Sequence, residues 1–170
     1  YLPNVEAVEW FVRDILPGLR VSWPGLRFHI VGRNPAPAVR ALASDAVSVT
    51  GTVPDVRPYL QHAAVVVAPL RLARGIQNKI LEAMAMGRPV VAASECAAAV
   101  QARSGTEFME AADAETFVRQ VDALLRDPAA AAAMGQAGRR CVQRSYSWDA
   151  HLSTIDRHLD RLRADQPMAA

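Results

Sequence analysis

The chain has 170 residues, of which 51% are hydrophobic and 21% are charged, and its formal net charge is +2. A chain of this length and composition forms one globular domain with a substantial core, which excludes a disordered protein. The nearly balanced charge, without a run of like charges, argues against a dedicated nucleic-acid-binding protein.

Two further features of the sequence limit the function. Cys96 and Cys141 lie far apart and form no CxxC pair, so we expect two isolated buried thiols and no metal site. No apolar run approaches the roughly 20 residues that cross a bilayer, and no signal peptide is apparent. Because the chain starts at Tyr1 without a Met, we expect a piece of a longer cytoplasmic protein.

The first segment, residues 5–16, places most of its apolar side chains on one helical face. We expect Asn4 to cap this helix and Pro17-Gly18 to end it. Strands and helices then alternate. Strands are predicted over residues 26–31, 47–50, 63–68 and 89–92, with a further short strand near Phe108. Helices are predicted over residues 35–43, 56–62, 77–86, 113–125, 129–144 and 148–163.

This alternation predicts an α/β fold. The strands are continuous apolar runs, which are typical of a parallel sheet covered by helices on both faces. We therefore expect residues 1–165 to form one doubly wound, Rossmann-like domain, followed by a disordered tail over 166–170. Ligands of such folds bind at the carboxyl ends of the strands, so the loops after the strands are the places to search for a site.

The loop after the third predicted strand carries the strongest functional pattern. Gly75 precedes a predicted helix start, which offers free N–H groups and a partial positive charge to a phosphate or diphosphate. Lys79 and the flanking Arg71 and Arg74 add full positive charges. Glu82 lies further into the helix, at a distance that suits a carboxylate accepting both hydroxyls of a ribose. An anion site beside a diol acceptor describes a nucleoside diphosphate.

Each of these residues also has a purely structural interpretation. A glycine before a helix is common, and a lysine on a helix usually lies in solvent. Glu82 differs, because it stands between apolar residues in a helix predicted to lie between two buried strands. A carboxylate in that place is costly unless it has partners, which favours a functional role.

The same residues belong to a longer pattern. The stretch GIQNKILEAMAMGRPVV, residues 75–91, resembles the retaining GT-B glycosyltransferases often called family 4, whose C-terminal domain carries a Glu, seven residues and a second Glu. Further segments agree at 28–32 (FHIVG), 49–55 (VTGTVPD), 64–69 (AVVVAP) and 139–148 (RRCVQRSYSW). More narrowly, the opening YLPN and the run RGIQNK resemble bacterial sugar transferases associated with exopolysaccharide gene clusters.

The resemblance implies a reaction and partners. The chain would be the C-terminal, donor-binding half of a hexosyltransferase-like GT-B enzyme, which moves a sugar from a nucleoside diphosphate to a glycan or lipid-linked acceptor. No metal or cofactor is implied, because the helix start and the cationic side chains stabilise the phosphates. The partner would be the protein's own N-terminal, acceptor-binding half. Without it we expect no transfer, and membrane contact, peripheral at the inner membrane, would come only through it.

The resemblance also implies a set of donor-binding residues. Glu82 would bind the ribose, the loop 75–78 would hold the diphosphate beside Lys79, and the loop after the second strand would border the nucleobase. The full implied set is Gly32, Arg33, Gly51, Thr52, Val53, Arg74, Gly75, Ile76, Gln77, Asn78, Lys79 and Glu82. Catalytic residues are not assigned.

One position departs from the family pattern. Arg74 stands eight residues before Glu82, where the family has its first Glu, which commonly contacts hydroxyls of the donor sugar. An Arg cannot accept those hydrogen bonds, although it pairs with phosphate or with a carboxylate. Three interpretations stay open: an acidic donor sugar, a sugar held differently, or a catalytically silent relative that binds nucleotide or a partner protein.

Two other enzyme classes share this type of sheet. A dinucleotide-dependent dehydrogenase is disfavoured, because the chain lacks G-x-G-x-x-G and Pro35 stands where that turn needs freedom. A sugar-nucleotide epimerase is a further alternative. We expect structural and not functional roles for the histidines and tryptophans, which are His29, His62, His151, His158, Trp10, Trp23 and Trp148. We expect the apolar face of the last helix to be partly exposed, with Leu152, Ile155 and Leu159.

Overall fold

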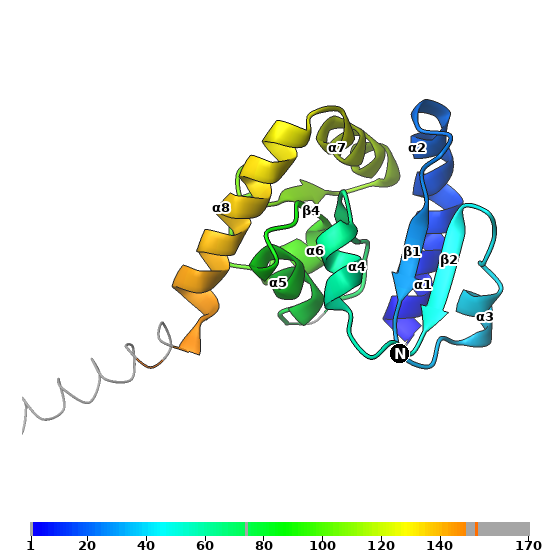
Figure 1. Cartoon of the computed structure of the whole chain (residues 1–170), viewed down its shortest axis with the longest axis horizontal. Helices are drawn as coiled ribbons and strands as arrows, with labels where there is room; N and C mark the ends of the chain where they lie inside the picture. Colours follow the sequence, from blue (N-terminus) through cyan, green and yellow to red (C-terminus); the bar gives the residue numbers. More distant parts are fainter. Residues whose placement is uncertain (1, 74, 149–151, 153–170) are drawn as a thin grey trace, which may run out of the picture.

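Figure 1 shows the computed structural model of the chain, which describes residues 2–73, 75–148 and 152. The strands in these ranges are β1 (Phe28–Val31), β2 (Val47–Gly51), β3 (Val66–Ala68), β4 (Val90–Ala93) and β5 (Met109–Ala111). The helices are α1 (Leu2–Trp10), the π-helical η1 (Phe11–Ile15), α2 (Leu16–Ser22), α3 (Pro37–Arg40), α4 (Arg57–His62), α5 (Asn78–Ala85), α6 (Ser94–Ala97), α7 (Ala114–Arg126) and α8 (Pro128–Tyr146).

A helical segment opens the chain and continues past its predicted end. The wider bonding of η1 ends where the Leu16 N–H donates to the Phe11 carbonyl. Pro17 then falls in the first turn of α2, where a missing N–H removes no helical hydrogen bond. The predicted stop at Pro17-Gly18 was therefore wrong. The predicted N-cap was wrong as well, because α1 begins at Leu2 and Asn4 lies inside it.

Every strand pair is parallel, as the apolar strands predict, but the strands form two sheets. Backbone hydrogen bonds join β1 to β2 and, separately, β3 to β4 and β4 to β5. The single sheet that we expected is thus divided within the described residues. Side chains join the two parts instead, because Phe11 of η1 packs on Phe28 of β1 at 4.3 Å and on Phe117 of α7 at 6.0 Å between ring centroids.

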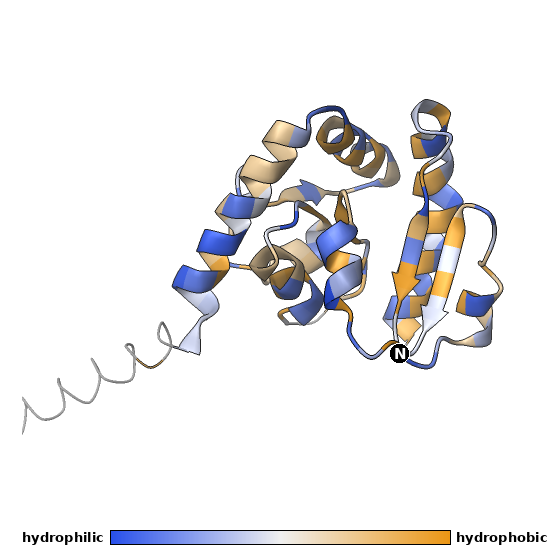
Figure 2. Cartoon of the chain, viewed as in Figure 1, coloured by the Kyte–Doolittle hydropathy of each residue, from blue (hydrophilic) through white to orange (hydrophobic). Residues whose placement is uncertain are grey.

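The core is densest around β4. All four residues of β4 are buried between β3 and β5, whereas in β3 only Ala68 is buried and Val66 and Val67 are partly exposed. α5 and α7 cover this sheet with their apolar faces, and Figure 2 shows apolar and polar residues alternating around α7 and α8, as in helices with one face in solvent.

α8 is held against the rest of the molecule by close backbone approach and by one buried carboxylate. Glu107, only 4% exposed, accepts hydrogen bonds from the Arg103 amide at 2.8 Å and from Arg144 of α8 at 3.3 Å. Burial alone would raise the pKa of Glu107, but the hydrogen bonds from Arg103, Arg144 and the Cys141 thiol outweigh it and hold the pKa below its ordinary value.

Several smaller predictions can be compared with the structure. Cys96 and Cys141 are free and buried, as expected. The short helix α6 was not predicted, and Trp148 was wrongly expected to pack, since it is 81% exposed at the end of the described helical region. His29 and His62 are exposed, as is Leu152. Most of the predicted helix 148–163, the tail 166–170 and the residues His151, His158, Ile155 and Leu159 lie outside the described residues.

No helix in the described ranges is both long enough and apolar enough to cross a membrane.

Candidate functional site

The loop between β3 and α5 forms an exposed surface beside a helix start. Gly75 has a φ of 69°, a left-handed conformation that favours glycine, and open space surrounds the position of its absent side chain. Ile76 is 48% exposed, and Gln77 precedes α5, which begins at Asn78. The N–H groups of Asn78 and Lys79 precede the first hydrogen bond of the helix, in which the Ile80 N–H donates to the Gln77 carbonyl at 2.9 Å. The predicted helix start is confirmed to within one residue.

α5 separates its residues into a buried face and a solvent face. Ile80, Ala83 and Met84 are buried, whereas Lys79 and Glu82 are exposed on the opposite face, one turn apart. The expectation that Glu82 lies buried between strands was therefore wrong, because the amphipathic pattern of α5 turns that position outward. The structure still brings a cation and a carboxylate together on one accessible face.

α1 supplies the neighbours of this loop. The Lys79 ammonium donates to Asn4 Oδ1 at 2.8 Å, and the Arg71 guanidinium donates to Glu6 Oε1 at 2.8 Å. Arg71 also lies over the ring of Trp10, 4.8 Å from its centroid. The sequence analysis missed Asn4 and Glu6 as parts of the site, because residues 65 and 75 positions away in the chain carry no local signal.

The environment of Lys79 changes its protonation. Neighbouring protein removes part of the water around the ammonium, and this desolvation lowers the pKa of Lys79, while the charge of Glu82 acts in the opposite direction. Beneath the loop, the buried Cys96 thiol donates to the carbonyls of Ala68 and Ala93, each at 3.2 Å, at the ends of β3 and β4. Burial raises the pKa of Cys96, so this thiol stays neutral and serves as part of the floor.

The loops after β1 and β2 lie near the start of α1 but do not enter these contacts. Gly32 and Arg33 are exposed after β1, and Figure 1 shows β1 and β2 pointing toward the side of the molecule where the N-terminus lies. Gly51 ends β2 with a φ of 71°, and Thr52 and Val53 follow it. α1 packs against α3, the helix that follows β1. Arg74 lies outside the described residues.

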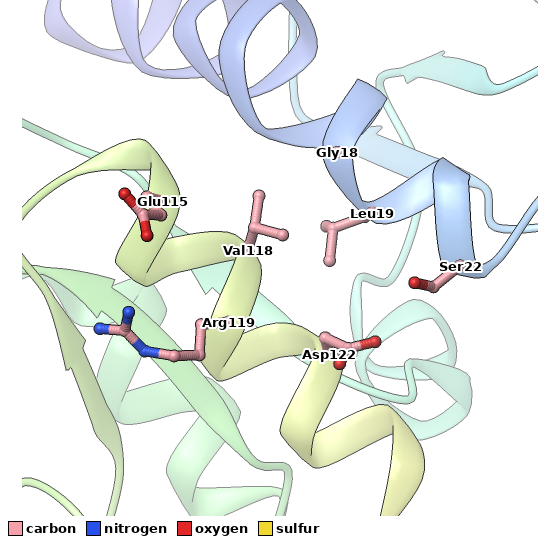
Figure 3. A pocket seen from close by; sticks show the side chains of 7 residues that line it. All are labelled: Gly18, Leu19, Ser22, Glu115, Val118, Arg119 and Asp122. Atoms are coloured by element: carbon pink, nitrogen blue, oxygen red, sulfur yellow. The ribbon is translucent and has the colours of Figure 1, made fainter.

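Two cavities lie away from this loop. A pocket of about 300 Å³ is lined by residues of α2 and α7, including Leu19, Glu115 and Asp122. Figure 3 shows these side chains. A second pocket of about 280 Å³ lies beside Arg88 and Gln136. Neither of these two pockets includes a described residue of the predicted donor-binding set, of which Gly75, Ile76, Lys79 and Glu82 are exposed. Within the described ranges, no group of three or more His, Cys, Asp or Glu is arranged to hold a metal ion.

Parallel strands alternating with helices, and a glycine-containing loop leading into a helix at a strand end, define a Rossmann-like α/β domain. The sequence matches the family model described as glycosyl transferases group 1 over residues 1–127, so the chain belongs to that family. A relative, the lipopolysaccharide core biosynthesis mannosyltransferase LpcC of Rhizobium leguminosarum bv. viciae, is 32% identical over 133 residues, which are 76% of this chain and 37% of LpcC.

Solved structures of glycosyltransferases and related enzymes share the fold. A glycosyltransferase from Rickettsia africae matches with a TM-score of 0.73 and 13% identity, over 92% of this chain and 45% of that one. Sucrose-phosphate synthase from Thermosynechococcus elongatus matches with a TM-score of 0.70 and 22% identity, over 89% of this chain and 42% of that one. HepE from Anabaena, in complex with UDP, matches with a TM-score of 0.69 and 16% identity, over 90% of this chain and 44% of that one. This chain thus spans less than half the length of these relatives, and its α/β fold matches that of one part of these GT-B structures.

Proposed function

We propose that this chain binds the nucleoside diphosphate of a sugar donor and is the donor-binding part of a retaining glycosyltransferase. The observation that carries the proposal is the exposed surface of the loop after β3 and the start of α5, where a helix start, a cation and a carboxylate lie together. Family membership supports glycosyl transfer, and two structural neighbours, HepE of Anabaena and TarM of S. aureus, were crystallised with UDP.

Each part of the surface then has a task. The Glu82 carboxylate accepts hydrogen bonds from the ribose hydroxyls, and the backbone from Gly75 to Asn78 holds the diphosphate. The left-handed φ of Gly75 and the open space around it let a phosphate come close to the backbone. The segment from Gly51 to Val53 borders the nucleobase, and Gly32 with Arg33 lines the same cleft.

The diphosphate is the leaving group of the reaction. When the bond to the sugar breaks, negative charge grows on the phosphate oxygen, and a preorganised cation with helix N–H groups stabilises that charge. Lys79 and the start of α5 provide both. The proposal therefore needs no metal, and transfer by the protein should persist when EDTA removes divalent ions.

The acceptor would be a glycan or a lipid-linked sugar used in polysaccharide assembly. The open surface around Lys79 and Glu82 supports a site that is completed by an acceptor-binding domain across a cleft. The chain spans 37% of the mannosyltransferase LpcC, which leaves ample length for such a domain in a protein of that size.

Arg74 favours one alternative. With an Arg in place of the first family Glu, the protein would bind a sugar nucleotide but transfer nothing, and so act as a regulator. Nucleotide binding without turnover of the donor in the protein at its natural length would favour this alternative, and Arg74→Glu should then create transfer.

Isothermal titration of the protein with UDP, GDP, ADP and NAD tests the proposal. One nucleoside diphosphate should bind, and Glu82→Ala should weaken it by about tenfold to a hundredfold, because a charge-assisted bond to the ribose is worth about 1.5–3 kcal/mol. Glu115→Ala is the matched control, since Glu115 is an exposed helical Glu that lines the pocket of Figure 3. Absence of binding to all four compounds by the protein at its natural length would refute the proposal.

A further inference from the structure

Arg71 is already engaged by the rest of the protein. Its guanidinium pairs with Glu6 at 2.8 Å and stacks on Trp10 at 4.8 Å from the ring centroid. The charge of Arg71 also contributes to lowering the pKa of Asp14, after the larger effect of the Arg13 hydrogen bond. Glu6 and Trp10 lie one turn apart on α1, so both contacts of this guanidinium come from one face of that helix.

The indole under Arg71 is buried and packed. Trp10 is only 5% exposed and packs edge-on against Phe117 of α7, with 5.8 Å between ring centroids. A guanidinium that is paired with a carboxylate and stacked on a fixed indole loses both contacts if it turns toward a ligand. This geometry suits an anchor that fixes the loop to α1.

Lys79 is engaged differently. Its described hydrogen bond goes to the neutral amide oxygen of Asn4, and an ammonium has three donors. In the part of the chain that the structure describes, no carboxylate forms an ion pair with it, although Glu82 lies one turn away. An approaching phosphate would therefore find a cation that is held in place but not neutralised. The partial desolvation that lowers the pKa of Lys79 makes an anionic partner still more favourable.

The sequence itself sets Lys79 apart. The chain has 19 basic residues other than histidine, and Lys79 is its single lysine. The planar fork of an arginine matches a carboxylate, as Arg71 matches Glu6, whereas an ammonium is a compact charge that accepts phosphate oxygens from several directions. A lysine in place of an arginine at this one position, beside the helix start, distinguishes Lys79 from the surface arginines.

We propose that these two cations have separate tasks: Arg71 anchors the donor loop to α1, and Lys79 supplies the charge that meets the diphosphate. Glu6 and Asn4 are then positioning residues, which orient Arg71 and Lys79 without contacting the ligand. This inference rests on the proposed function, because it assigns the phosphate contact within that same site.

Titration of variants separates the two tasks. Wild type is first titrated with UDP, GDP and ADP. The nucleoside diphosphate that binds most tightly, and the corresponding nucleoside, are then titrated into each variant. Lys79→Gln should weaken the diphosphate at least about tenfold and leave nucleoside binding unchanged. Arg71→Gln and Glu6→Gln should weaken both compounds to a similar, smaller degree, and the double variant no further than either single one. Arg126→Gln is the control, because Arg126 also pairs with a carboxylate, at 2.7 Å, and lies over Trp23 at 5.8 Å.

If a variant fails to fold, a direct measurement on the single lysine of the wild-type chain tests the inference instead. Reductive methylation with ¹³C-formaldehyde labels Lys79 and the α-amino group, which differ in pKa. The Lys79 signal should shift when the diphosphate binds and should not shift with the nucleoside. If wild type binds the diphosphate but the Lys79 signal stays fixed, or if only Arg71→Gln loses diphosphate selectivity, the inference is overturned while the proposed function stands. If wild type at its natural length binds no nucleotide, both fail.

Discussion

Substitution of Gly135 by Ala tests how closely α8 approaches the end of α5. A side-chain carbon at Gly135 would lie 2.1 Å from the Gly87 carbonyl oxygen and 2.7 Å from its carbon, well inside the 3.0 Å that real contacts keep. The carbonyl cannot turn away, because the Gly87 N–H bonds to Met84 O at 2.9 Å and the Arg88 N–H to Ala83 O at 3.0 Å. α8 must therefore move by about 1 Å.

Two opposing effects set the magnitude. Alanine gains roughly 1 kcal/mol over glycine in a helix interior, whereas overpacking against fixed backbone costs about 1–3 kcal/mol or more. Since no rotamer change relieves a clash with a carbonyl, we expect the upper end of that cost, a net loss of about 2 kcal/mol. For a chain of this size, that loss lowers the midpoint of thermal unfolding by roughly 4–8 °C.

Urea unfolding followed by circular dichroism measures the change. Ala133→Gly, at an exposed position of the same helix, is the control and should lose about 1 kcal/mol from helix propensity alone. A Gly135→Ala variant as stable as wild type, or more so, would show that α8 does not lie against Gly87 as described.

Three further substitutions or conditions have defined outcomes. Asp113→Ala removes the carboxylate that accepts from the first turn of α7 at 2.7 Å and should cost about 1 kcal/mol in urea unfolding, while Asp113→Asn restores most of it. Trp23→Phe removes the indole hydrogen bond to Asp122 at 2.8 Å and should also cost about 1 kcal/mol of unfolding free energy. An unchanged stability would show that this bond does not hold Trp23 to α7. The pKa of Glu107 is lowered in the fold, so its stabilising effect is complete above the ordinary value of 4.5 and is lost as the pH falls through the folded value. Acid unfolding of Glu107→Gln should lack that step.

Local patterns in the sequence predicted most of the elements, and their failures have physical causes. Asp113 was expected to start a helix, and it caps α7 as a side chain that bonds the first turn. Pro17 was misjudged, because the π-helical bonding before it cannot be recognised from composition. The prediction that Glu82 is buried rested on the apolar residues next to it in sequence, and neighbours in sequence point in different directions on a helix. With Ile80, Ala83 and Met84 placed inward, 82 must face outward.

The candidate site was only partly predictable for a different reason. The loop from Gly75 and the pair Lys79 and Glu82 are close in sequence, so their proximity follows from helix geometry. Asn4 and Glu6 meet them only through the packing of α1, which no local pattern specifies. The donor role of these residues stays a prediction until nucleotide binding is measured.

The divided sheet leads to a residue-level prediction for amide hydrogen exchange. In β3, the Val66 N–H donates to Pro89 O beside β4 at 2.9 Å. Successive N–H groups of a strand point in opposite directions, so the Val67 N–H points to the edge of β3 that pairs with no described strand. Val67 should exchange much faster than Val66, and the amides of Val91 in the central strand β4 should exchange slowest. Equal protection at Val66 and Val67 would contradict a free edge and show that another strand occupies it in solution.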